Sequence, residues 1–271
     1  MTAEFRLTEY LARIGHTGPL APNLDTLAHL HAAHVNTIPF EGMDPLFGRP
    51  VALDLAAVQD KLVASRRGGY CFEQNTLFKA ALEAIGFQVT GLGARVRWMS
   101  PPDAPLGPRE HMLLKVDLPE GPHLVDVGFG ACVLDTPLRF DVGVEQATGM
   151  GTFRLTEADG HYWLAARQPD GYRMMYAFDL TPQIEADYAL GNYYTATSPA
   201  APFVHVLIME RLAADKRFKL INRRFVIEAR DGEVVLEREI ATADELGHVL
   251  GETFGVVPPV PVGEVFVKIS P

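Results

Sequence analysis

Cys71 is one of two cysteines in the 271-residue chain, and its surroundings favour a reactive thiol. It follows Gly68 and Gly69 and precedes a run of apolar residues with helical spacing that ends at Gly86. The sulfur is therefore expected at a helix N-terminus, where unpaired N–H groups and the helix dipole favour an anion. The thiolate is the nucleophilic form of cysteine. Taken alone, however, a lone cysteine is more often a small buried side chain.

A nucleophilic thiol needs a base, and the base needs a group that orients it. His111 begins one apolar strand pattern and Asp126 ends the next, with a segment rich in Pro and Gly (119–122) between them. Asp126 lies between two valines, and a carboxylate in such a buried setting requires a partner. Cys71, His111 and Asp126 therefore predict a nucleophile, a base and an orienting acid.

The register of the expected hairpin decides whether His111 and Asp126 meet. A loop centred on residues 118 and 119 places the two side chains directly opposite each other, with Cβ atoms roughly 4.5–5.5 Å apart. A loop centred on residues 120 and 121 would instead pair Asp126 with Lys115. We expect the first register, because it completes the catalytic set.

Four segments resemble motifs of the arylamine N-acetyltransferase family, in that family's order. Residues 67–73 read Arg-Gly-Gly-Tyr-Cys-Phe-Glu, and residues 126–130 read Asp-Val-Gly-Phe-Gly. Residues 30–41, which end in Ile-Pro-Phe-Glu, and residues 192–199, which are followed by Phe203, are also similar to family signatures.

Two positions depart from the family pattern. Gly42 stands where the family usually has Asn after Pro-Phe-Glu, and Ala131 stands where it usually has a third Gly. The first change affects a local side-chain hydrogen bond near the active-site helix, and the second affects the loop after Asp126. Neither change touches the three catalytic positions.

Periodicity and resemblance together predict an α+β protein. The expected plan is an N-terminal helical bundle (1–86) that carries the nucleophile, a central antiparallel β-barrel (87–180) that carries His and Asp, and a connector helix with an α/β lid (181–271). The resemblance implies a catalytic core like that of cysteine proteases. The site would lie where the first two units meet.

Hydrophobic periodicity and turn residues also predict the individual helices and strands. Helices are expected from Phe5 to Gly15, after the caps Asn23 and Asp54, after Cys71, and over 182–194 and 243–253. Strands are expected at 89–98, 111–118, 123–127, 152–156, 161–166, 173–178, 203–209, 218–221, 224–228 and 234–239. The chain contains no internal repeats.

The resemblance implies acetyl transfer from acetyl-coenzyme A to an arylamine or arylhydrazine. An acetyl thioester on Cys71 would link two half-reactions, giving ping-pong kinetics. The implied substrate walls are Phe40, Val96, Phe129 and Phe203. Gly128 and Gly130 would let the cofactor approach the backbone.

Other functions would use the same three residues. A cysteine hydrolase or transglutaminase-like amidase is one alternative, and an amide synthase that closes a macrolactam in a biosynthetic pathway is another. A hydrolase must admit water to the acyl-enzyme, whereas a transferase must exclude water and favour an amine. A non-catalytic binding protein is a more distant alternative, because it would have no use for the triad.

The composition and charge of the chain limit the partners that we expect it to bind. The net charge is −10 and no basic stripe is present, so we expect no nucleic-acid partner. No signal peptide or membrane-spanning apolar run is seen, so we expect a cytoplasmic protein with no membrane contact. We expect no metal, since His31 and His34 lack further ligands nearby. Cys132 is expected to be a small buried side chain, Arg67 to be structural, and the existence of a homo-oligomer stays open.

Overall fold

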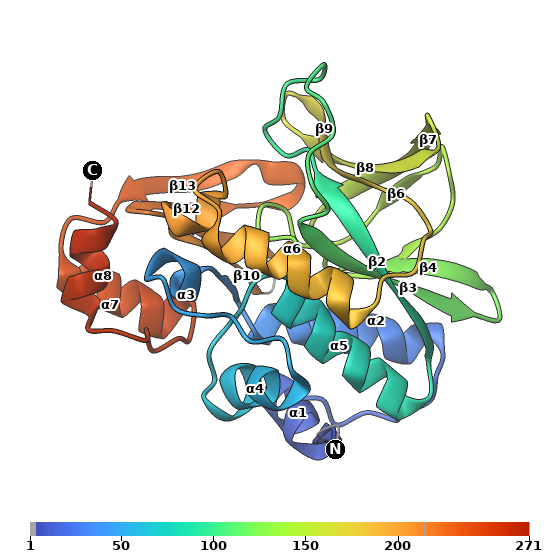
Figure 1. Ribbon diagram of the computed structural model, residues 1–271, viewed down its shortest axis with the longest axis horizontal. Helices are drawn as coiled ribbons and strands as arrows, with labels where there is room; N and C mark the ends of the chain where they lie inside the picture. Colours follow the sequence, from blue (N-terminus) through green and yellow to red (C-terminus); the bar gives the residue numbers. More distant parts are fainter. Residues whose placement is uncertain (1–3, 214, 271) are drawn as a thin grey trace.

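The computed structural model of the protein describes residues 4–213 and 215–270 (Figure 1). Its N-terminal part is helical. The helices are α1 (Leu7–Ile14), α2 (Leu24–Thr37), α3 (Met43–Leu46), α4 (Leu55–Gln59), which continues into a π-helical turn (Asp60–Ala64), and α5 (Cys71–Ile85). Asn23 and Asp54 cap α2 and α4 as expected, because their side chains accept hydrogen bonds from the backbone N–H groups of Thr26 and Ala57.

The central part is an antiparallel sheet that curves almost into a barrel. Its eight strands follow the order β5-β4-β3-β2-β9-β8-β7-β6. The strands are β2 (Gln88–Val96), β3 (His111–Leu118), β4 (Gly121–Val125), β5 (Leu138–Arg139), β6 (Glu145–Ala147), β7 (Thr152–Ala158), β8 (His161–Gln168) and β9 (Gly171–Phe178). Phe153, Leu164 and Tyr176 are among the apolar side chains packed inside it. The sheet positions β3, which begins at His111, against α5.

The C-terminal part is a second antiparallel sheet with helices on it. Its strands are β1 (Phe40–Glu41), β10 (Ile208–Ala213), β11 (Lys216–Ile221), β12 (Arg224–Glu228) and β13 (Val234–Glu239), in that order. Helix α7 (Ala243–His248), its π-helical continuation (Val249–Thr253) and α8 (Val262–Lys268) cover it (Figure 1). Strand β1 comes from the N-terminal third of the chain and pairs with β10, which ties the first part of the chain to the last.

Helix α6 (Glu185–Thr197) connects the two sheets and runs alongside the start of α5 (Figure 1). This agrees with the predicted helical connector. No helix within the described residues is long and apolar enough to cross a membrane.

The predicted strand over 203–209 is wrong. Residues Pro202–Val204 form a short 3-10 helix, and β10 begins only at Ile208. The backbone N–H groups of His205 and Val206 both bond to the carbonyl of Pro202, at 3.0 and 2.8 Å, which closes a turn that an extended chain could not make. The patterns also missed α3, α8, β1, β5 and β6, all of which are short.

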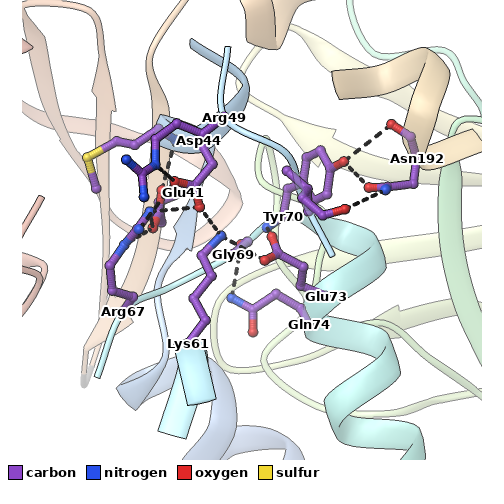
Figure 2. Close-up of polar contacts among 12 residues, drawn as sticks. Glu41, Asp44, Arg49, Lys61, Arg67, Gly69, Tyr70, Glu73, Gln74 and Asn192 are labelled. Atoms are coloured by element: carbon purple, nitrogen blue, oxygen red, sulfur yellow. Dashed lines mark hydrogen bonds and ion pairs between the residues drawn. The ribbon is translucent and has the colours of Figure 1, made fainter. Parts of the chain in front are cut away.

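A buried network of ion pairs joins β1, α3, the π-helical turn and the start of α5 (Figure 2). The Arg67 guanidinium donates two hydrogen bonds to Oε1 of Glu41, at 2.9 and 2.5 Å. The Lys61 ammonium lies 2.7 Å from carboxylate oxygens of both Asp44 and Glu73. Arg67 therefore has the structural role expected of it, and the network fixes the segment just before Cys71.

Arg67→Ala tests the contribution of this network. We expect the free energy of unfolding to fall by about 3–5 kcal/mol, because the substitution leaves the carboxylate of Glu41 buried without its partner. Urea unfolding measures the loss. The control is Arg224→Ala, which removes an exposed, solvent-screened pair with Glu237 and should leave the urea midpoint almost unchanged. Equal small losses in both variants would show that the buried network adds nothing to stability.

Candidate active site

Cys71 is the first residue of α5, as the sequence predicts. The Glu73 carboxylate accepts a hydrogen bond from the backbone N–H of Tyr70 at 3.1 Å, which satisfies one donor at this helix start. Gly68 is required, because a Cβ there would lie 2.1 Å from the carbonyl oxygen of Pro39. The Cys71 side chain is buried, and its sulfur lies 3.7 Å from the carbonyl oxygen of Glu110, the residue before His111.

His111 and Asp126 meet as predicted. Nε2 of His111 donates to Oδ2 of Asp126 at 2.6 Å, and both side chains are almost completely buried. Because Nε2 is engaged in this way, Nδ1 is the ring nitrogen left to exchange a proton with another group.

The predicted register of the hairpin is wrong by two residues. Leu118 pairs with Gly121 and Leu114 with Val125, so the loop centres on residues 119 and 120, between the two alternatives considered. Asp126 follows the last pair of the ladder and is a diagonal neighbour of His111 rather than its direct partner. A shift of two residues keeps each side chain on its original face, so the contact survives the error.

Asn75 is a residue of the site that the sequence analysis missed. Its Nδ2 donates to Oδ1 of Asp126 at 3.0 Å and to the carbonyl of Met112 at 2.7 Å. Its Oδ1 accepts the backbone N–H of Val127 at 3.2 Å. Because Asn75 lies four residues after Cys71, one helical turn brings both to the same face of α5. This spacing was the signal that could have identified it.

His111 and Asp126 each stabilise the charged form of the other. Burial alone would lower the pKa of His111, but the Asp126 carboxylate, together with interactions with Cys71, raises it to about 10. Burial would raise the pKa of Asp126, but the charge of His111 and hydrogen bonds from His111, Asn75 and the Gly128 backbone hold it below its usual range. At neutral pH the arrangement therefore favours an imidazolium held by a carboxylate.

Aromatic side chains enclose the histidine ring. The ring of Phe129 lies edge-on to His111 with centroids 5.2 Å apart, and Tyr176 lies on it at 5.0 Å. Trp98 contacts Phe129 in turn, at 6.0 Å. Val96, the last residue of β2, is partly buried against the same cluster. Phe129 and Val96 thus lie on the His111 side of the site. Tyr176 and Trp98 lie on the same side, but the sequence analysis did not identify them.

Phe40 and Phe203 form a second aromatic group on the Cys71 side. Their ring centroids are 5.8 Å apart, and Phe203 is 5.6 Å from the ring of Tyr70. A Cβ on Gly42 would lie 2.8 Å from a ring carbon of Phe203. The first departure from the family pattern therefore leaves space that this phenylalanine fills. Ala131, the second departure, is partly buried against the barrel core.

Gly128 and Gly130 allow the turn after Asp126 to pack closely on its neighbours. A Cβ on Gly128 would lie 2.7 Å from the Cα of Cys71, and one on Gly130 would lie 2.2 Å from the ring of Phe40. Both glycines are therefore needed for packing, independently of any contact with a cofactor.

The two histidines and the second cysteine considered in the sequence analysis are buried and contact other side chains of the core. His31 and His34 are fully buried, and burial lowers their pKa values to about 4 and about 3. His34 bridges Tyr10 and Gln74. Cys132 is buried as expected; burial raises its pKa, and its sulfur accepts a hydrogen bond from the Arg217 guanidinium at 3.4 Å.

A family model described as N-acetyltransferase matches residues 23–259. The arylamine N-acetyltransferase of Escherichia coli K12 is 39% identical over 251 residues, which cover 92% of this chain and 88% of that protein. The arylamine N-acetyltransferase of Mycolicibacterium smegmatis is 41% identical over 250 residues, covering 91% and 90%.

Solved structures give the same result. The arylamine N-acetyltransferase of Salmonella typhimurium superposes with a TM-score of 0.91 at 35% identity, over 99% of each chain. The Mycobacterium marinum enzyme in complex with CoA gives 0.92 at 36% identity, over 97% of this chain and 98% of that one. The chain therefore belongs to the arylamine N-acetyltransferase family.

Proposed function

We propose that the protein moves an acetyl group from acetyl-CoA to an arylamine or arylhydrazine through a thioester on Cys71. The observation that carries this proposal is the buried pair of His111 and Asp126 beside a cysteine at a helix start, which provides a base already oriented for the thiol. A relative of 36% identity has been solved with CoA, which supports the choice of donor.

Before the first half-reaction the Cys71 thiol has already given its proton to Nδ1 of His111, so the site holds a thiolate beside an imidazolium. The thiolate attacks the carbonyl carbon of acetyl-CoA, and the C–S bond to CoA breaks. The proton on His111 passes to the departing CoA sulfur, leaving acetyl-Cys71. Backbone N–H groups at the start of α5 are suited to hold the developing oxyanion, and one such donor typically contributes about 2.7–4 kcal/mol.

In the second half-reaction the amine attacks the acetyl carbon and loses a proton to His111. The C–S bond to Cys71 breaks, and the enzyme returns to its thiolate–imidazolium state. We propose that Phe129 and Val96 form one wall for the aromatic ring and Phe40 and Phe203 the other. Gly128 and Gly130 would let the pantetheine chain pass close to the backbone.

Intact mass spectrometry tests the intermediate. The protein mixed with acetyl-CoA is expected to gain one acetyl group, which an arylamine such as aniline removes faster than buffer alone. Cys71→Ala should remain unmodified, and Cys132→Ala should be acetylated like the wild type. Acetylation of Cys71→Ala would refute the nucleophile, and loss of the acetyl group to water as fast as to amine would indicate a hydrolase.

Asp126→Asn tests the orientation and charge of His111. A carboxamide cannot stabilise the imidazolium, so we expect turnover to fall by about 10⁴-fold, as in triads where the acid is replaced by its amide. The wild-type ring should stay protonated at neutral pH and lose its proton as the pH rises through about 10, whereas the variant ring should lose it at lower pH. NMR titration of the ring nitrogens measures this, and an unchanged titration would show that Asp126 does not set the charge of His111.

A further inference from the structure

Helix α6 contacts the residues on either side of Cys71 and the chain that leads into His111. We infer that Asn192 and Gly191 of this helix are positioning residues, which fix the placement of the Cys71 segment relative to the strand that carries His111. The inference rests on the proposed function, since it concerns how the thiol and its base are held together.

On the nucleophile side, α6 is tied to Tyr70, the residue before Cys71. The Tyr70 hydroxyl donates to the side-chain oxygen of Asn192 and also lies 3.5 Å from its backbone carbonyl (Figure 2). Nδ2 of Asn192 donates to the carbonyl of Val51 at 2.9 Å, so the amide is held from both ends. Tyr70 is almost completely buried, and burial raises its pKa, so its hydroxyl remains a donor.

On the base side, α6 packs on the chain that leads into His111. A Cβ on Gly191 would lie 2.8 Å from the carbonyl oxygen of Arg109 and 2.8 Å from the Cζ atom of Phe72. Gly191 therefore lies between the residue after Cys71 and a residue two positions before His111. This single position sets how closely the two segments can approach.

One turn earlier, Tyr188 extends the same contact. Its hydroxyl donates to the carbonyl of Leu92 at 3.4 Å, and its ring lies 6.2 Å from that of Phe72. Leu92 belongs to β2, which pairs with β3 through Ala94 and His111. The helix thus spans the start of α5 and the strands beside the base.

The composition of α6 agrees with a role beyond helix formation. Gly191 and Asn192 lie in the interior of a 13-residue helix, yet Gly and Asn are both poor helix formers. Glycine alone lowers helix stability by roughly 0.5–1 kcal/mol relative to alanine. Their contacts with Phe72, Arg109 and Tyr70 supply the physical reason for them at these positions.

A cavity lies beside this contact. Asn192 and Val51 both line a cavity of about 990 Å³ between segment 45–53, α6 and α8. The Asn192 amide links α6 to Val51 at the edge of this cavity. A displacement of 1 Å at a reacting group can slow a reaction about 10²-fold, so a loose link would affect the thiol directly.

The test compares the reactivity of Cys71 in Asn192→Ala, Tyr70→Phe and the double variant. Iodoacetamide alkylation of Cys71, followed by mass spectrometry across pH 5–10, reports how the thiol is coupled to His111 without any CoA or amine. We expect each single variant to slow alkylation at pH 7 by about tenfold and to change its pH profile. The double variant should be no slower than Asn192→Ala, because that change already removes the bond that Tyr70→Phe removes.

Matched controls separate positioning from folding. Leu190→Ala alters an exposed side chain of the same helix and should alkylate at the wild-type rate. Gly191→Ala should slow alkylation, whereas Gly247→Ala in α7, where a Cβ would meet only ordinary contacts at 3.5 Å, should not. Asn192→Asp keeps the acceptor for Tyr70 but loses the donor to the Val51 carbonyl, so it should alkylate faster than Asn192→Ala and more slowly than the wild type.

The outcomes distinguish this inference from the proposed function. Wild-type alkylation rates and pH profiles in Asn192→Ala and Tyr70→Phe, or additive losses in the double variant, would overturn the positioning role. The positioning role would also be overturned if Leu190→Ala and Gly247→Ala slowed alkylation as much as Asn192→Ala and Gly191→Ala do. Failure of the wild type to accept acetyl from acetyl-CoA would refute the proposed function alone, since alkylation measures the thiol and its base directly.

Discussion

The buried hydrogen bond between His111 and Asp126 is the interaction on which the rest of the site depends. A charged pair removed from water is stabilising only when its geometry is good and its remaining polar atoms are satisfied. Here Oδ1 of Asp126 accepts from Asn75 and from the Gly128 backbone, while Oδ2 accepts from the histidine. The carboxylate is thus supported on both oxygens, and the imidazole gains both its orientation and its charge.

This requirement explains why the helical part and the barrel must meet where they do. Asn75 belongs to α5 with Cys71, yet its hydrogen bonds go to Met112, Asp126 and Val127 of the barrel. The helix that carries the nucleophile therefore also completes the surroundings of the acid. A shift of α5 along the sheet would separate the thiol from the base and leave Asp126 partly unsatisfied, so stability and reactivity favour the same arrangement.

The sequence predicted the local features well, because they follow from nearby residues. Short-range signals mark Cys71 at a helix start and the caps of α2 and α4. They also mark the strand that begins at His111 and the strand that ends just before Asp126. The hairpin register was wrong by two residues, since hydrophobic alternation fixes the face of a strand but not which even shift it adopts. Asn75 and the pairing of β1 with β10 were missed because they depend on partners 51 and 170 residues away.

Burial of the triad also bears on the choice between transfer and hydrolysis. Cys71 and His111 are only 4% and 3% exposed, and aromatic rings surround them on both the barrel side and the β1 side. Such walls exclude water from an acyl-enzyme while offering a flat apolar surface to an aromatic ring. Because water has no apolar surface to bury, these walls favour an arylamine over water as acceptor. We therefore propose that the aromatic rings around the triad, rather than the triad itself, would direct a thioester on Cys71 to an amine.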